Sequence, residues 1–393
     1  MDPKQRGKIL ITCSAGLVDY VRREVKDLGY ECGESHKTGL ELQADQYDAM
    51  RLNLNLRTAY NVLFLLKKFE CSSPDELYRN VAELPWEDMI SAHEYLSVVS
   101  RVNTGHVDNS MFAGLKVKDA IVDRIVRQTG LRPDSGKDRN KVVVQLYWKD
   151  DLCRLYLNTS GLKLSDRGYR KMPHTAPLRE SLAAAIIMAT GYDGTEPLVC
   201  PMCGSGTLAI EAALIAGRRA PGLLRNNYGF MHMKYFDKAA WQQMRNEALK
   251  QSKTRGGKAA LKPARIIATD IDPQAIEAAR KNAMTAGVSH LIDFDVCDFA
   301  ATVIPPGNGT IVINPEYGLR MGQMQKLKKT YKRIGDFFKQ KCAGYTGYIF
   351  TGNPALSKVV SLRTSRRLVF YNGNIECRLL KYELYAGTKN KQA

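Results

Sequence analysis

The sequence has no long apolar run, few histidines and no regular pattern of paired cysteines. Its 393 residues contain no apolar stretch near 18 residues, which predicts that no helix spans a membrane. The first residues, Met1 to Lys4, lack the apolar region of a signal peptide. Together with nine scattered cysteines, these absences favour a reducing, cytoplasmic compartment in which the thiols are free.

Patterns of metal ligands are also scarce. Only Cys200 and Cys203 have the Cys-x-x-Cys spacing, and the second pair that a zinc site needs is missing. In the N-terminal half His36, His93 and His106 stand isolated, which is the usual situation of a structural or solvated histidine. We therefore expect no metal, and no histidine acting as a general base.

Acidic residues are few in the C-terminal part of the chain. Residues 166–393 contain 34 lysines and arginines but 17 acidic residues, a net charge of +17, whereas residues 1–165 carry a net +1. Between Lys326 and Lys341 the single acidic residue is Asp336. Such a concentrated positive charge favours a polyanionic partner, and we expect nucleic acid. A merely soluble basic protein is the alternative.

The length and the order of elements predict three domains. Residues 1–66 form a small α+β unit, in which Leu52 to Val62 is expected to be helical, and residues 67–165 form a second α+β unit. Residues 166–393 alternate strands and helices, as in a doubly wound α/β domain, and end in a hairpin around Asn372-Gly373-Asn374.

A glycine-rich turn follows the apolar strand at residues 198–200. Gly204-x-Gly206-x-x-Ala209 formally matches a dinucleotide fingerprint, which on its own is a weak signal. A nicotinamide enzyme would place an acidic residue about 20 positions onward, at the end of the next strand. Here that strand ends at Asp270, far too late. S-adenosylmethionine, which has no phosphate, is the alternative ligand of this turn.

Acidic residues follow the next two strands. Asp270 ends the strand at residues 265–269 and is expected to bind the ribose hydroxyls of the cofactor, with Ile271 against the adenine face. Asp272 precedes Pro273 and is expected to cap the following helix. Asp298 follows another strand and is expected to accept from the adenine amine. The alternative for Asp270 and Asp272 is that both are ordinary helix-start residues. The alternative for Asp298 is an ordinary loop carboxylate.

A further strand, Ile311 to Ile313, ends abruptly in Asn314-Pro315-Glu316-Tyr317. This arrangement suits a flat ring that carries an amine. The Asn314 oxygen and the Pro315 carbonyl accept hydrogen bonds from the amine, and Tyr317 stacks on the ring. The alternative is an ordinary Asn-Pro turn beside a core tyrosine.

As a set, these motifs resemble the bacterial THUMP-domain-containing 23S ribosomal RNA guanine-N2 methyltransferases, whose members are often also named N6-adenine-specific DNA methylases. The resemblance covers nearly the whole chain. It implies a doubly wound, Rossmann-like methyltransferase sheet with a C-terminal antiparallel hairpin, preceded by an α+β region with a ferredoxin-like unit and a THUMP RNA-binding domain. The matching segments are Cys200-Pro-Met-Cys-Gly-Ser-Gly-Thr, Ile210-Glu-Ala-Ala, Ala220-Pro-Gly-Leu, Asp270-Ile-Asp-Pro and Asn314-Pro-Glu-Tyr-Gly.

The resemblance implies S-adenosylmethionine-dependent methylation of guanine N2 in ribosomal RNA, with transfer RNA as a second substrate to consider. It places Cys200 and Met202 in the cofactor turn. Two positions depart from the family: Cys200 stands where an aspartate is usual, and Glu316 where a proline is usual. Adenine-N6 methylation of DNA or RNA, and a non-catalytic RNA-binding or ribosome assembly factor, remain the alternatives. The oligomeric state is left open.

Overall fold

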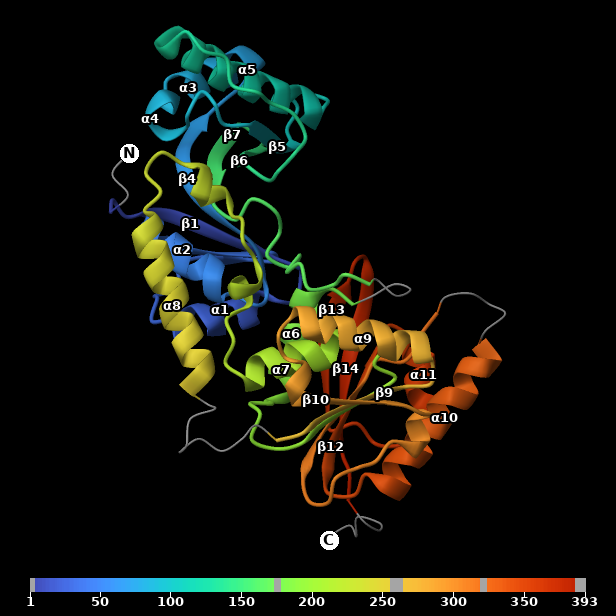
Figure 1. Cartoon of the computed structure of the whole chain (residues 1–393). Helices are drawn as coiled ribbons and strands as arrows, with labels where there is room; N and C mark the ends of the chain where they lie inside the picture. The colour runs from blue at the N-terminus through green and yellow to red at the C-terminus, as the bar shows by residue number, and fades with distance from the viewer. Residues whose placement is uncertain (1–3, 173–177, 255–263, 319–323, 386–393) are drawn as a thin grey trace. The chain divides into compact units, whose positions relative to one another are not determined.

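The chain forms two compact units (Figure 1). The first contains Val21–Asp166, Pro221–Glu247 and the described residues up to Cys13, and the second contains Ser14–Tyr20, Arg167–Ala220 and the rest of the described chain. No helix in the described ranges is both long and apolar enough to cross a membrane. The computed structural model describes residues 4–172, 178–254, 264–318 and 324–385.

One seven-stranded sheet with the order β2-β3-β1-β4-β7-β6-β5 forms the base of the first unit. Its longest strand, β4, pairs with β1 along its first half and with β7 along its second, so it joins the two α+β halves in one sheet. Only β5 and β6 pair in parallel. The strands are β1 (Gly7–Cys13), β2 (Ser35–His36), β3 (Gly39–Ala44), β4 (Ala59–Glu70), β5 (Leu96–Asn103), β6 (Val142–Lys149) and β7 (Leu152–Asn158).

Two helices of this region have recognisable caps. Asp45 and Asp48 form a reciprocal capping box at the start of α2, and Gly130 ends α5 with a φ of +72°. The helix expected over Leu52 to Val62 is wrong, because α2 ends at Asn55 and the chain has entered β4 by Ala59. Strand pairing there overrides the local apolar spacing. The helices are α1 (Val18–Asp27), α2 (Gln46–Asn55), α3 (Pro74–Ala82), α4 (Trp86–Met89) and α5 (Ser110–Thr129).

Residues 221–247 pack within the first unit, although they follow strand β8 of the second along the chain. The Arg225 guanidinium is buried and donates to the carbonyl oxygens of Ser160, Leu162 and Lys163. It also lies 4.7 Å from the ring centroid of Tyr228, a cation–π contact. The segment includes two short 3-10 helices, at Pro221–Leu224 and Gly229–His232, and the first part of α8 (Lys238–Thr254).

The second unit is built on a seven-stranded sheet with the order β10-β9-β8-β11-β12-β14-β13. The first five strands are parallel, and β14 and β13 form an antiparallel hairpin at one edge. The strand order reverses between β8 and β11, which is the switch point where open α/β sheets bind ligands. The strands are β8 (Leu198–Pro201), β9 (Ile266–Asp270), β10 (Ile292–Val296), β11 (Gly309–Ile313), β12 (Tyr345–Thr351), β13 (Arg366–Asn372) and β14 (Ile375–Glu383).

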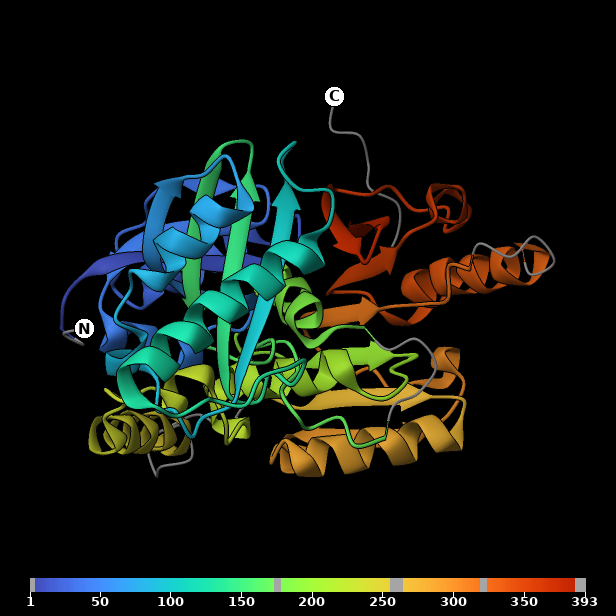
Figure 2. The same ribbon diagram turned by 90° about the horizontal axis from the view of Figure 1, so that it is seen from above.

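Helices cover both faces of this sheet, and Figure 2 shows α9 and α10 on opposite faces. Helix α10 buries Leu327, Tyr331, Ile334 and Phe338 against β11, β12 and β14, as its apolar spacing predicts. The doubly wound sheet with a C-terminal hairpin is therefore confirmed. The helices are α6 (Glu180–Thr190), α7 (Thr207–Ala216), α9 (Pro273–Thr285), α10 (Met324–Lys341) and α11 (Pro354–Val359), with short 3-10 turns at Ser289–Leu291 and Phe299–Ala301.

Candidate active site

Three neighbouring parallel strands end at one edge of the second sheet. Strand β8 lies between β9 and β11, with Val199 opposite both Ile267 and Ile311. Because adjacent strands lie about 4.8 Å apart, the ends of β9 and β11 are within about 10 Å of each other. The fold therefore gathers the glycine turn, Asp270 and Asn314 at one edge of the sheet.

The turn after β8 has a backbone that few residues adopt. Met202, Gly204 and Gly206 have φ angles of +57°, +53° and +82°. For Met202 this left-handed conformation costs about 1–2 kcal/mol, a strain of the kind found at ligand sites. A side chain at Gly206 would come within 2.9 Å of the Ala279 Cβ, whereas one at Gly204 would meet no atom of the described residues within 4 Å. Gly206 thus allows close helix packing, and Gly204 borders open space.

The Asp270 carboxylate connects the glycine turn to the start of α9. Its Oδ2 accepts from the Gly204 N–H at 2.9 Å, and its Oδ1 accepts from the Asp272 N–H at 3.1 Å. Each oxygen keeps a second lone pair, so the group can also accept from ribose hydroxyls, the role predicted for it. Asp272 caps α9 through the Gln274 N–H, as expected. The side chain of Ile271 is 69% exposed, so it can cover a flat apolar ring.

The Asp298 carboxylate already accepts hydrogen bonds that the sequence does not indicate. Its Oδ1 accepts from the Ala300 N–H at 2.9 Å and from the Arg333 guanidinium at 2.7 Å. Partial burial opposes ionisation, but these two hydrogen bonds outweigh it and lower the pKa of the carboxyl. Arg333 also lies 4.9 Å from the Phe299 ring centroid. An adenine amine would have to use Oδ2, which accepts no hydrogen bond from the described residues.

Asn314 follows the fully buried strand β11 and presents a polar atom without a partner. Its Oδ1 is covered, yet no donor among the described residues bonds to it. A buried acceptor left unpaired costs about 1–3 kcal/mol, so this atom fits a ligand that brings an N–H. Pro315 is buried beside it, and Glu316 is exposed.

Tyr317 is half buried and fixed at both ends of its side chain. Its hydroxyl accepts from the Asn372 amide at 2.8 Å, and its ring meets Phe350 edge-on at 6.4 Å. Gly352 leaves room for this ring, because a Cβ there would come within 3.0 Å of it. Burial raises the pKa of Tyr317 to about 12, so the hydroxyl stays protonated near neutral pH. The role of the hydroxyl is therefore to position the Tyr317 ring.

The Cys200 and Cys203 thiols are poor metal or redox groups. Burial raises the pKa of Cys200 to about 12 and that of Cys203 well above its usual value. Both groups are thus protonated at neutral pH, whereas metal binding and thiol exchange need the thiolate. Cys200 is buried in β8, so its predicted contact with a cofactor stays a prediction.

Sequence reasoning missed Asn282, a buried residue within α9. Its Oδ1 accepts from the backbone N–H groups of Lys171 and Met172, at 3.0 and 3.3 Å. Its amide donates to the carbonyl oxygens of Met172 and Ser205. It therefore ties the chain at residues 171–172 to the glycine turn. The available signal was an asparagine on the side of the helix that otherwise buries alanines and Ile276.

A buried ion pair also escaped the sequence reasoning. The Arg167 guanidinium donates to Glu211 Oε2 on α7 at 2.6 Å, and the Tyr169 hydroxyl donates to Oε1 at 3.0 Å. All three side chains are buried, and each needs the others because a lone buried charge is costly. The cluster anchors the segment that precedes α6 to the helix that follows the glycine turn.

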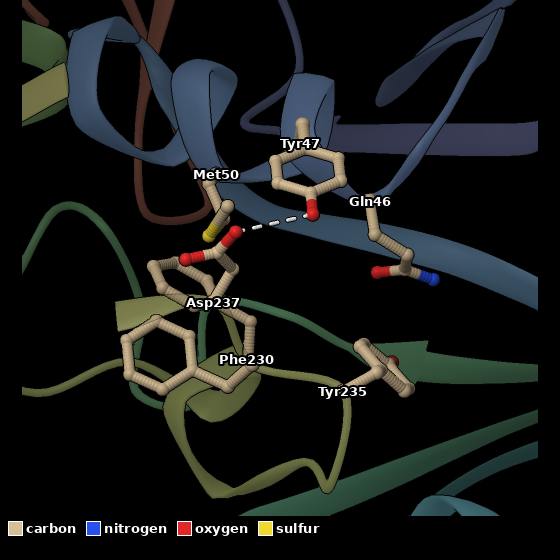
Figure 3. Close-up of a pocket in the computed structure, with 7 residues that line it drawn as sticks. Gln46, Tyr47, Met50, Phe230, Tyr235 and Asp237 are labelled. Atoms are coloured by element: carbon tan, nitrogen blue, oxygen red, sulfur yellow. Dashed lines mark hydrogen bonds between the residues drawn. The ribbon is translucent and has the colours of Figure 1, made fainter. Parts of the chain in front are cut away.

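A small hollow in the first unit contains none of the predicted site residues. It lies where α2 meets residues 230–237, and aromatic side chains fill most of its lining (Figure 3). The Tyr47 hydroxyl donates to Asp237 Oδ2 at 3.3 Å across it. We interpret it as a packing hollow that follows from the placement of residues 221–247 in this unit.

Known protein families match the chain in three successive parts. The RlmL ferredoxin-like domain matches residues 8–63, the THUMP domain residues 71–158, and the RMKL-like methyltransferase domain residues 167–381. The third match alone covers more than half of the chain. The chain belongs to the RMKL-like methyltransferase family. The resemblance seen in the motifs is thereby confirmed, and with it the ferredoxin-like and THUMP assignments of the N-terminal part.

Relatives of this RMKL-like chain carry matching names. The ribosomal RNA large subunit methyltransferase K/L of Syntrophotalea carbinolica is 35% identical over 389 residues, which cover 96% of this chain and 53% of that protein. The chain therefore spans about half the length of the curated K/L relatives that it matches. A Synechocystis protein whose name suggests an RNA methyltransferase is 32% identical, with 95% and 96% of the two chains covered. A proposed methyltransferase crystallised with SAH is 25% identical, with a TM-score of 0.86 and 98% and 100% coverage.

Proposed function

We propose that this RMKL-like chain is an S-adenosylmethionine-dependent RNA methyltransferase that methylates a base exocyclic amine, the N2 amine of a guanine in ribosomal RNA. The observation that carries the proposal is the covered Asn314 Oδ1 at the end of β11, an acceptor without a donor among the described residues. An exocyclic amine would supply this donor and remove the cost of the unpaired acceptor.

S-adenosylmethionine would be held along the ends of β8, β9 and β10. Asp270 would accept from the ribose hydroxyls, Ile271 would cover the adenine ring, and Asp298 Oδ2 would accept from the adenine amine. When bound, this cofactor supplies an electrophilic methyl group on a sulfonium. The proposed cofactor-binding residues are Cys200, Met202, Gly204, Gly206, Asp270, Ile271 and Asp298.

On the substrate side, Asn314 and Pro315 would activate the amine. The lone pair of such an amine is delocalised into the ring, so the nitrogen is a poor nucleophile. Hydrogen bonds from the amine to Asn314 Oδ1 and to the Pro315 carbonyl favour pyramidalisation and stabilise the positive charge that develops during attack. Each preorganised contact contributes about 2.7–4 kcal/mol at comparable sites. Tyr317 would hold the base by stacking, worth about 1–3 kcal/mol.

RNA is the proposed partner because two independent features favour it. The THUMP match supplies an RNA-binding module outside the methyltransferase domain, and residues 166–393 carry a net charge of +17. The K/L relatives are named for large-subunit ribosomal RNA, so this RNA is the first substrate to test and transfer RNA the second. The proposed compartment is the cytoplasm.

Calorimetry and methyl transfer test the proposal together. The chain should bind S-adenosylmethionine by titration and should transfer a labelled methyl group to unmodified ribosomal RNA in preference to transfer RNA and DNA. A chain that binds no S-adenosylmethionine would refute the enzyme assignment and leave an RNA-binding or assembly factor. Transfer to DNA alone would refute the choice of RNA.

A further inference from the structure

A polar hollow lies beside the C-terminal hairpin of the second unit, next to the candidate active site. It has a volume of about 140 Å³ and lies between α11, the end of β12 and the strands β13 and β14. The side chains that decide its chemistry are Ser357, Lys358, Arg367, Glu376 and Arg378. No residue in the proposed chemistry above belongs to this set.

Cations outnumber acids in the lining of this hollow. Glu376 pairs with Arg378 at 3.2 Å, so the acid is already balanced. Lys358 and Arg367 have no acidic partner among the described residues, and the Arg367 Nε–H donates to the neutral hydroxyl of Thr364. Two uncompensated cations that face one cavity in a strongly basic domain form a site for an anion.

The hollow and Tyr317 lie on opposite faces of the same part of the sheet. Glu376 and Arg378 alternate along β14 with Cys377, so the side chain of Cys377 points to the other face of the sheet. That face carries Tyr317, whose hydroxyl lies 3.8 Å from the Cys377 sulfur. Gly352, at the end of β12, lines the hollow and also borders the Tyr317 ring. Gly352, which has no side chain, thus lies between the hollow and the Tyr317 ring.

We propose that this hollow binds a phosphodiester of the RNA strand next to the target nucleotide. The proposal rests on the proposed function, because it takes the base to lie against Tyr317. The strand would cross the sheet edge at Gly352, where nothing projects, and Lys358 and Arg367 would bind a phosphate on the far side. The Glu376–Arg378 pair lines the same hollow and adds no net charge to it. The site fixes the strand and reads no base.

The test compares Lys358→Ala/Arg367→Ala with Arg366→Ala in the full-length chain. Arg366 is the matched control because it is exposed, lies on the same strand and pairs with Lys381, which places it on the opposite face from Arg367. The double variant should bind a 20-nucleotide single-stranded RNA about tenfold more weakly at low salt. The slope of log K against log salt should fall by about 0.7 for each phosphate that the variant no longer neutralises. Arg366→Ala should resemble the wild type in both measurements.

Further arms separate the remaining explanations. Unchanged affinity for S-adenosylmethionine shows that the double variant is folded. Equal RNA affinity and salt slope in wild type and double variant would overturn the subsite, as would equal losses in Arg366→Ala. If the wild type binds inorganic phosphate and the double variant does not, while both bind RNA equally well, the hollow is a site for a free anion instead. A wild type that binds RNA but transfers no methyl group would refute the proposed function, while the binding data still decide the subsite.

Discussion

Replacing Asn314 by alanine should separate activity from stability. In the free protein the covered Oδ1 atom has no donor among the described residues, which costs about 1–3 kcal/mol. Alanine removes this cost together with a little side-chain packing. For a domain of this size, 1 kcal/mol corresponds to about 2–4 °C, so the melting temperature should stay the same or rise by a few degrees.

Turnover should respond in the opposite direction. Loss of a preorganised acceptor costs about 2.7–4 kcal/mol in the transition state, so Asn314→Ala should lower kcat about 10²- to 10³-fold. The affinity for S-adenosylmethionine should stay near that of the wild type. Asn308→Ala is the control, because Asn308 is exposed at the opposite end of the same strand. The assays are thermal melting, calorimetry and methyl transfer to ribosomal RNA.

A drop of several degrees in the melting temperature of Asn314→Ala, with a parallel loss of cofactor binding, would refute this reasoning. It would mean that the asparagine supports the turn itself, as in an ordinary Asn-Pro turn beside a core tyrosine. Loss of activity in Asn308→Ala to the same extent would likewise show that the assay reports the folding of β11 and no specific contact.

Three other changes test separate parts of the site. Asp270→Asn should weaken S-adenosylmethionine binding at least about tenfold in calorimetry, because its amide would face backbone N–H groups, whereas Asp272→Asn keeps the helix cap and should bind normally. Glu316→Gln should lower the KM for RNA about two- to fivefold by removing an exposed negative charge, and an unchanged KM would place that residue away from the strand. The pKa of Asp298 lies below its usual value of 3.8, so its pairing with Arg333 stabilises the fold above about pH 4 and is lost as the pH falls further. Arg333→Ala should therefore lower the melting temperature more at pH 7 than at pH 2, where the contact with the Phe299 ring remains, and an equal loss at both values would contradict the assignment.

Local features of the sequence predicted much of the second unit. The strands that lead into the glycine turn, Asp270 and Asn314 were readable because each is a short apolar run followed within a few positions by residues with special backbone or polar needs. Helix α10 was readable from the 3.6-residue spacing of its apolar face. Such signals lie within a few residues, so no knowledge of the tertiary structure is needed to see them.

Features that depend on distant partners could not be read in this way. Nothing near residue 225 indicates that its guanidinium is buried against carbonyl groups at residues 160–163. The roles of Asn282 and of the Arg167–Glu211 pair are likewise fixed by backbone or side-chain groups 44 or more positions away. The domain boundaries near residues 66 and 165 stay predictions, and the packing of residues 221–247 in the first unit carries no local signal.

The identity of the methylated nucleoside decides whether the proposed reaction is correct. Unmodified ribosomal RNA, labelled S-adenosylmethionine and the purified chain are incubated, and the RNA is digested for nucleoside mass spectrometry. We predict labelled N2-methylguanosine, which disappears with Asn314→Ala. Labelled N6-methyladenosine alone would contradict the base assignment, and no labelled nucleoside from a chain that binds the cofactor would contradict the proposed reaction.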